Sequence, residues 1–253
     1  MRVLALSDVH VDFEENARWI AALSAGEYLD DVLILAGDVS DSPSRVEWCL
    51  DTLSRRFMRV VFVPGNHDLW VARGQRHETS LQRFERLRQI ALDCDVSMQV
   101  YDCNQVSIVP LFGWYDFSFG QPTQELRDVW MDFYACRWPE SFGAAEIAEH
   151  FLAMNEACLS TVNAVVISVS HFLPRIDVMP DRGVRGSRGL YPVLGSTRLE
   201  TQIRKLKPLL HVYGHSHWNN RVRLEGITYV NNAMGYPHEM LGAARSLACI
   251  HET

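Results

Sequence analysis

Short apolar runs of strand length recur along the chain, and most of them end in polar residues. The runs lie at 2–10, 31–41, 59–68, 105–114, 164–172 and 209–217. They are rich in β-branched residues, which is typical of strands. Because they are apolar throughout rather than alternating, we expect strands that are buried on both faces and covered by helices.

Helical patterns lie between these runs. Apolar residues at helical spacing predict helices over 13–26, 42–57, 77–93 and 144–162. We expect the first helix to end at Gly26 and the second to start with Ser42 as N-cap and Pro43 at the first helical position.

The order of these elements defines the expected fold class. The tail carries two further strand-like segments, 221–232 and 246–252, which we expect to pair. Strands and helices alternate along the chain, which predicts an α/β protein. Because no linker, repeat or low-complexity segment interrupts the pattern, we expect a single domain over residues 1–253.

Composition narrows the class of protein. A chain of 253 residues, 47% of them hydrophobic, can bury a large core. The net charge of −7 argues against a protein that coats long nucleic acid. No run is long enough to span a membrane, and the N-terminus lacks a signal-peptide pattern. The six cysteines are scattered, so we expect reduced, mostly buried thiols in a cytoplasmic protein.

Polar residues with metal-binding capacity cluster after several of the expected strands. They are Asp8 and His10, Asp38, Asn66 with His67 and Asp68, His171, and His215 with His217. Sites in α/β sheets form beyond the carboxyl ends of strands, so we expect these side chains to meet. Oxygen and imidazole donors without cysteine suit Mn, Fe or Zn, and there are enough of them for two ions. Glycines before Asp38, Asn66 and His215 would allow sharp turns.

Each cluster alone has an ordinary structural explanation. Asp8 and His10 would then be a helix cap and a loop histidine, and His171 a hydrogen-bonded core residue. The ordered combination of D-x-H, GD, GNHD, a lone His and GHxH is far more specific. From Asp8 to His217, this combination resembles the calcineurin-like metallophosphoesterase superfamily.

The resemblance implies a four-layer sandwich of two mixed β-sheets flanked by helices, with a dinuclear metal centre at the strand ends. One ion would be held by Asp8, His10, Asp38 and His217. The other would be held by Asp38, Asn66, His171 and His215, so that Asp38 bridges the two. His67 would lie beside the leaving group, and Asp68 would fix its turn. Asp41 either orients His67 or caps the following helix.

The activity implied is metal-dependent hydrolysis of a phosphate mono- or diester by a hydroxide that two metal ions generate. His67 would stabilise charge or protonate the leaving oxygen. Protein phosphatases of the superfamily carry GDxVDRG, whereas this chain has GDVSDSP. Lipid A precursor hydrolases have arginine at the position of His67, so both subfamilies are disfavoured.

Two other activities stay open, and the partner is predicted only by class. A nuclease or cyclic-nucleotide phosphodiesterase is the alternative enzyme. A non-catalytic scaffold is disfavoured because every matched ligand is present. We expect a small or medium phosphate-ester substrate, with no prediction of its identity or of the oligomeric state.

Two segments are candidates for specificity. The aromatic stretch 113–120 would either wall the pocket or form a hydrophobic cluster. Arginines 175, 182, 185 and 188 lie within the stretch 175–189, which would either grip a second phosphate or be a solvated loop. Asn231 and Asn232 would either line the site or make a turn.

Overall fold

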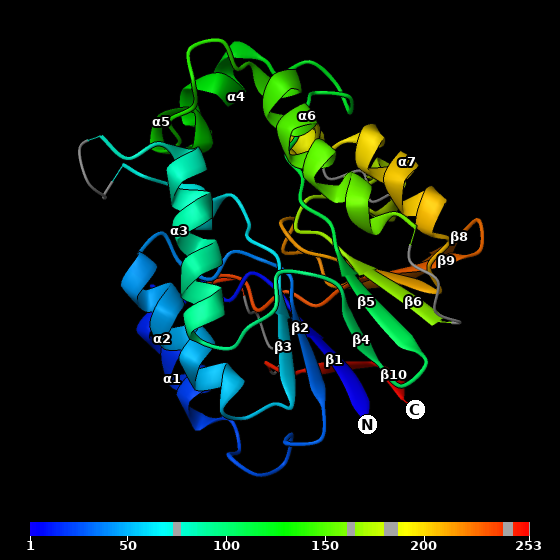
Figure 1. The fold of residues 1–253 in the computed structure, drawn as a ribbon. Helices are drawn as coiled ribbons and strands as arrows, with labels where there is room; N and C mark the ends of the chain where they lie inside the picture. Colours follow the sequence, from blue (N-terminus) through cyan, green and yellow to red (C-terminus); the bar gives the residue numbers. More distant parts are fainter. Residues whose placement is uncertain (73–76, 161–164, 180–186, 240–244, 253) are drawn as a thin grey trace.

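The structure is a computed structural model that describes residues 1–72, 77–160, 165–179, 187–239 and 245–252. Within these residues two β-sheets pack face to face, and helices cover their outer faces (Figure 1). The four-layer α/β sandwich expected from the resemblance is therefore confirmed.

The first sheet has the strand order β10-β1-β2-β3. Its strands are β1 (Arg2–Leu6), β2 (Val32–Leu35), β3 (Arg59–Phe62) and β10 (Ala248–Glu252). The strands β1, β2 and β3 run parallel, and β10 is antiparallel to β1. The sheet is therefore mixed, as predicted.

The second sheet has the order β4-β5-β6-β7-β9-β8. Its strands are β4 (Tyr101–Cys103), β5 (Val106–Pro110), β6 (Val165–Val169), β7 (Leu210–Tyr213), β8 (Asn220–Leu224) and β9 (Ile227–Asn231). The expected pairing of the two tail segments is wrong. Segment 221–232 folds into the β8–β9 hairpin, whereas β10 joins the other sheet beside β1.

The helices begin and end close to the predicted positions where the apolar spacing was clear. They are α1 (Glu14–Ala22), α2 (Pro43–Ser54), α3 (Ser80–Asp93), α4 (Gln124–Val129), α5 (Asp132–Ala135), α6 (Ala144–Asn155) and α7 (Thr197–Leu206). Short 3-10 turns are η1 (His67–Leu69), η2 (Glu156–Cys158), η3 (Ile176–Val178) and η4 (Ser187–Val193). The helix α1 ends before Gly26, and α4, α5 and α7 were not predicted. Ser42 holds the N-cap position of α2, as predicted, but its side chain makes no hydrogen bond to the helix backbone. Its Oγ lies 3.0 Å from Ser44 Oγ instead.

The core explains why the strands are apolar throughout. Along β1, Val3 and Ala5 face the second sheet, whereas Leu4 and Leu6 face the layer of α1, α2 and α3. The outer face of the second sheet packs on α6 and α7 through Leu152 and other apolar residues. Both faces of the central strands are therefore buried, as the sequence predicted, whereas the edge strand β8 has exposed residues at alternate positions.

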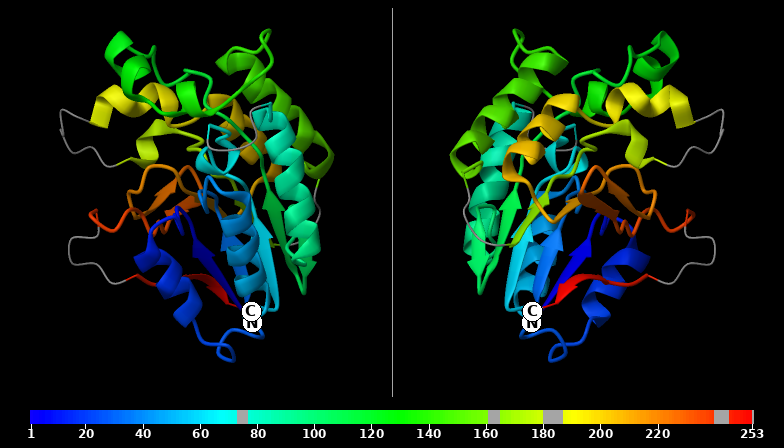
Figure 2. Two further views of the ribbon diagram at one scale, coloured as in Figure 1. Left: turned by 90° about the vertical axis from the view of Figure 1, so that its left-hand side faces the viewer. Right: turned by 90° about the vertical axis from the view of Figure 1, so that its right-hand side faces the viewer.

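The parallel strands direct their following loops to one region. The loops after β1, β2, β3, β6 and β7 contact one another there, as in the hydrogen bond from Gly214 N to His171 O, 2.9 Å. The chain termini lie side by side at the other end of β1 (Figure 2). The expected convergence of the polar clusters is thus a consequence of the sheet topology.

The structure bears on two expectations drawn from the composition, the burial of the cysteines and the length of apolar segments. Of the six cysteines, Cys49 is buried and Cys249 is exposed, and the others have intermediate exposure. The expectation that most are buried is wrong. In the described ranges, no helix has the length and apolarity that a membrane crossing requires.

Candidate metal centre

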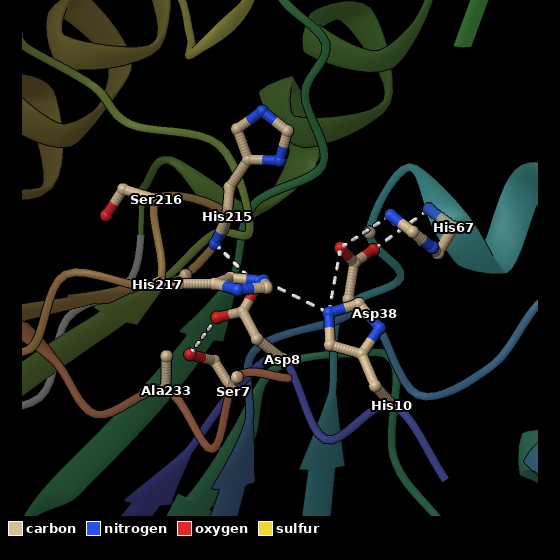
Figure 3. A network of polar contacts seen from close by, with 12 residues as sticks. Ser7, Asp8, His10, Asp38, His67, His215, Ser216, His217 and Ala233 are labelled. Carbon is tan, nitrogen blue, oxygen red and sulfur yellow. Dashed lines mark hydrogen bonds and ion pairs between the residues drawn. The ribbon is translucent and has the colours of Figure 1, made fainter. Parts of the chain in front are cut away.

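The structure brings the sequence-predicted side chains together at the strand ends. In the first sheet, the loop after β1 supplies Asp8 and His10, the loop after β2 supplies Asp38, and the loop after β3 supplies Asn66 and His67. In the second sheet, the loop after β6 supplies His171, and the loop after β7 supplies His215 and His217. All are buried except His67 and His217, whose side chains are 17% and 14% exposed. In Figure 3, His10, Asp38 and His217 converge around a common space. The site is thus largely enclosed by protein.

Two overlapping groups of potential ligands lie within this cluster. One atom from each of Asp8, His10, Asp38 and His217 lies within 4.8 Å of the others, and the same holds for Asp38, His171 and His215. The amide Oδ1 of Asn66 lies 3.1 Å from His171 Nε2 and so adjoins the second group. Asp38 is common to both groups, which is the geometry required of a bridging carboxylate.

The hydrogen bonds around the second group leave three acceptor atoms facing one another. His171 Nδ1 donates to Ala36 O (2.9 Å), and His215 Nε2 donates to Val193 O (3.0 Å). The remaining ring nitrogens, His171 Nε2 and His215 Nδ1, therefore carry lone pairs and lie 3.1 Å apart. Asn66 Oδ1 lies beside them and, as an amide oxygen, carries no proton that it could donate. Such a set is repulsive until a cation lies among it, so these residues fit a metal ion.

In the first group, the neighbouring Asp8 and Glu239 raise the pKa of His217 against the effect of burial. His217 Nδ1 donates to Glu239 Oε2 at 2.6 Å, which turns Nε2 toward the other members of the group. That nitrogen lies 3.0 Å from His10 Nε2 and 3.5 Å from Asp8 Oδ1. An outer carboxylate that fixes a histidine tautomer is a common support of metal-binding imidazoles.

Burial sets the protonation states that metal binding needs. Burial lowers the pKa of His10 and of His171 well below the usual range, and lowers the pKa of His215 to about 4. The imidazoles are thus neutral and able to ligate. Burial and the neighbouring Asp8 raise the pKa of Asp38 well above its usual range. Clustered buried carboxyl groups beside neutral imidazoles favour a bound cation, and the oxygen and nitrogen donors suit Mn, Fe or Zn.

The backbone of the ligand loops is strained. Five non-glycine site residues adopt left-handed φ values: Asp8 (51°), His10 (44°), Asp38 (55°), His215 (68°) and His217 (52°). Each such residue costs about 1–3 kcal/mol, and this kind of strain concentrates at functional sites. The surrounding fold therefore stabilises an arrangement that the local sequence disfavours.

Glycines next to the ligands serve for two different reasons. Gly37 has a φ of +86°, as expected for a sharp turn. At Gly65 the requirement is space, because an added Cβ would lie 2.2 Å from Asp38 Oδ1 and 2.6 Å from His171 Cε1. Gly65 therefore lets the loops after β2, β3 and β6 approach closely.

Asp68 joins two of the ligand loops. Its Oδ2 accepts from the backbone N–H groups of Asp38 (2.9 Å) and Gly65 (2.8 Å). Its Oδ1 accepts from those of Val39 (2.8 Å) and Ser40 (2.9 Å). Burial raises the pKa of Asp68 to about 7, and the four N–H donors oppose this shift. The carboxylate fixes not only its own turn, as expected, but also the loop that carries Asp38.

His67 lies beside the ligand groups. Its ring stacks on Trp70 with centroids 3.7 Å apart, and its Nε2 lies 3.3 Å from Tyr236 Oη and 3.9 Å from Asp38 Oδ2. Burial lowers the pKa of His67 to about 3, so the ring is neutral near pH 7. A protonated His67, which the proton-donor role calls for, therefore requires a nearby negative charge such as that of a bound phosphate.

Asp41 lies in the same loop as Asp38, one residue before Ser42, which holds the N-cap position of α2. Its carbonyl oxygen accepts from Nη1 of the buried Arg83 at 3.0 Å. The N-cap position of α2 belongs to Ser42, so the alternative role of Asp41 as that helix cap is wrong. Pairing of Asp41 with His67 stays a prediction.

Several residues around the site were not indicated by the sequence motifs. Asp132 accepts from Asn66 Nδ2 at 2.8 Å, and Glu239 accepts from His217. Tyr236 and Trp70 lie against the ring of His67. None of them belongs to a matched ligand motif, although Trp70 lies two residues after the GNHD segment.

The segments considered for specificity have other roles in the described residues. Trp114 and Tyr115 are buried in the core, where Trp114 packs against Trp138 and Phe172. The hydrophobic-cluster alternative is therefore correct for these two residues. Asn231 Nδ2 donates to Gly214 O and Ser216 Oγ in the loop after β7, and Asn232 Nδ2 donates to Ala5 O on β1.

The arginine-rich segment is described only in part. Arg175 forms ion pairs with Asp177, Glu200 and Glu225, which are not among the candidate ligands. Arg182 and Arg185 lie outside the described residues, as does the side chain of Arg188. The proposed grip on a second phosphate stays a prediction for these three.

Comparison with known proteins agrees with this geometry. The family described as calcineurin-like phosphoesterase matches residues 1–219, and the chain belongs to that family. The protein is accordingly a metallophosphoesterase, a hydrolase of phosphoric esters. The recognition of this superfamily from the ordered motifs is confirmed.

A sequence match and a structural match are both to the same protein, PptH. The chain is 25% identical over 256 residues to the [Acyl-carrier-protein] phosphodiesterase PptH of Mycobacterium tuberculosis (strain ATCC 25618 / H37Rv), covering 93% of this chain and 78% of that protein. The crystal structure of Phosphopantetheinyl Hydrolase (PptH) from Mycobacterium tuberculosis superimposes with a TM-score of 0.83 at 25% identity, covering 98% of this chain and 95% of that one. Another solved structure, 12% identical with a TM-score of 0.55, covers 92% of this chain and 90% of its own and shows the fold alone.

Proposed function

We propose that this protein hydrolyses a phosphodiester of an acyl carrier protein and releases the phosphopantetheinyl group. The observation that carries the proposal is the likeness to PptH, which extends over 98% of this chain at a TM-score of 0.83. Such a substrate is larger than the small or medium ester expected from the sequence. The partial exposure of His67 and His217, at 17% and 14%, leaves one side of the site accessible to it.

The proposed ligands are those of the two groups above. Asp8, His10, Asp38 and His217 hold one ion, and Asp38, Asn66, His171 and His215 hold the other. When bound, two such ions act as Lewis acids on phosphoryl oxygens and lower the pKa of water. The facing acceptor atoms of Asn66, His171 and His215 support this assignment for the second ion. The choice among Mn, Fe and Zn is left to metal analysis.

His67 is the proposed proton donor to the leaving oxygen. Its Nε2 faces Asp38 and Tyr236 and is not part of either ligand group. The negative charge of a bound phosphodiester raises the pKa of the imidazole, which favours protonation at the moment it is needed. The stack on Trp70 holds the ring in place, and Asp41 is the proposed orienting carboxylate.

We also propose that residues 1–253 act as one domain in the cytoplasm. The apolar core between the two sheets draws on β1 and β2 of one sheet and β6 and β7 of the other. Separate folding of either half would expose this surface to water, which supports a single cooperative unit.

The test is direct conversion of a carrier protein. Purified protein is loaded with Mn²⁺ and incubated with a phosphopantetheinylated acyl carrier protein, and intact mass spectrometry follows the carrier. We expect a product lighter by one phosphopantetheinyl group, and no product with Asp38→Asn. Hydrolysis of bis(p-nitrophenyl) phosphate without any change in the carrier protein would reject this substrate while leaving the phosphoesterase activity in place.

A further inference from the structure

Asp132 is a buried carboxylate that the proposed mechanism does not use. It is 3% exposed and begins α5, in a segment that carries none of the family motifs. Its Oδ1 accepts from Asn66 Nδ2 (2.8 Å) and Trp70 Nε1 (2.6 Å), and its Oδ2 accepts from Trp130 Nε1 (2.8 Å). Three N–H donors therefore converge on this one side chain, which also hydrogen-bonds the Tyr115 hydroxyl.

This carboxylate decides which end of the Asn66 amide faces the ligand cluster. An amide can present either its oxygen or its NH₂ group, and the partner on the far side selects between them. Because Asp132 accepts, the NH₂ group of Asn66 turns toward it and Oδ1 lies 3.1 Å from His171 Nε2. The reversed amide would set two acceptors against each other at Asp132 and would point N–H groups at the second ligand group.

The same carboxylate holds two rings that contact other site residues. Trp70, bonded to Oδ1, stacks on His67 with centroids 3.7 Å apart. Trp130, bonded to Oδ2, meets His215 edge to face with centroids 5.9 Å apart. One buried group thus reaches a candidate ligand directly and two further site histidines through indole rings.

We propose that Asp132 is a positioning residue that keeps the Asn66 oxygen directed at the second metal position and braces His67 and His215 through Trp70 and Trp130. The inference rests on the proposed role of Asn66 as a ligand. It assigns to α5, which the family motifs do not cover, a specific part in metal binding. Removal of groups that orient ligands commonly weakens metal binding by about 10–100-fold.

The test measures stepwise Mn²⁺ binding to metal-free protein by titration calorimetry, without substrate. Asp132→Ala removes all acceptors, and Asp132→Asn keeps one oxygen. The matched control is Asp128→Asn, an exposed carboxylate on α4 that accepts from Gln124 Nε2. We expect Asp132→Ala to bind one Mn²⁺ as wild type does and the other about 10–100-fold more weakly, with Asp132→Asn in between and the control unchanged.

A reciprocal variant identifies which ion is affected. Glu239 supports His217 in the first group, so Glu239→Gln should weaken the ion that Asp132→Ala leaves intact. The double variant should then weaken both ions. Excess Mn²⁺ should restore the turnover of Asp132→Asn toward wild type, which a general loss of structure would not allow.

Three results would overturn the proposal. The first is binding of both ions by folded Asp132→Ala within twofold of wild type. The second is equal weakening of both ions, which marks a structural role only. The third, decisive if Asp132→Ala does not fold, is wild-type binding by Asp132→Asn. Because no carrier protein enters the binding assay, failure of the proposed substrate would not produce any of these results.

Discussion

The carboxylate of Asp68 offers a sharp test of how the ligand loops are held. It accepts four backbone N–H groups, two on each oxygen, from the loops that carry Asp38 and Asn66. Asp68→Asn keeps the shape but replaces one oxygen by NH₂. One pair of N–H groups, either those of Val39 and Ser40 or those of Asp38 and Gly65, then faces donors instead of an acceptor.

The expected loss follows from two hydrogen bonds to a charged group. Such bonds contribute about 1.5–3 kcal/mol each, so the free energy of unfolding should fall by about 3–6 kcal/mol. The total free energy of unfolding of a native protein is about 5–15 kcal/mol, so the expected loss is a large share of the stability. At about 2–4 °C per kcal/mol for chains of this size, the Tm should fall by about 6–24 °C.

Urea unfolding of the metal-free protein at pH 8, followed by tryptophan fluorescence, measures this loss. At that pH Asp68 is ionised, since its pKa is about 7. Asp93→Asn is the control, because that exposed carboxylate at the end of α3 accepts only from Gln89 among the hydrogen bonds described; it should change stability by less than about 0.5 kcal/mol. If Asp68→Asn unfolds within about 0.5 kcal/mol of wild type, the loops are not held by this carboxylate and the reasoning fails.

Three further outcomes test the site and the core. Asp38→Asn should lower the affinity for both metal ions, whereas His10→Ala should mainly weaken one; equal effects in metal analysis would contradict the bridging role. His67→Ala should keep the metal content and cut turnover by about 10²–10⁴, less for esters of p-nitrophenol, and equal losses for good and poor leaving groups would reject proton donation. Burial lowers the pKa of His211 to about 3, below the value near 6.5 of an unfolded chain, so its protonation favours unfolding as pH falls below about 6.5. Between pH 7 and pH 5, wild type should lose about 2 kcal/mol more than His211→Gln in urea unfolding, and parallel losses would contradict this.

The fold was predictable where one pattern decided it. Apolar strands, and helices such as α3, followed from local spacing, and burial of both strand faces followed from the absence of alternation. The partner of β10 could not be predicted from local spacing, because its pairing with β1 joins residues at opposite ends of the chain. Nothing local in segment 246–252 distinguishes that partner from the nearby hairpin.

The site was predictable only as far as its motifs extend. Asp8, His10, Asp38, His171, His215 and His217 were found because they follow strands in a recognisable order. Asp132 and Glu239 were not, because their hydrogen bonds to Asn66 and His217 join residues that are 66 and 22 positions apart in the chain. The role of Asp68 was anticipated for its own turn, but its bonds to the loop of Asp38 depend on tertiary structure.

The most direct test of the dinuclear centre is a crystal structure of the Mn²⁺-loaded protein with anomalous data collected near the manganese edge. We expect two anomalous peaks about 3.5–4 Å apart, with the carboxylate of Asp38 in contact with both and the Asn66 oxygen in contact with one. A single peak, or two peaks that do not share Asp38, would contradict the account.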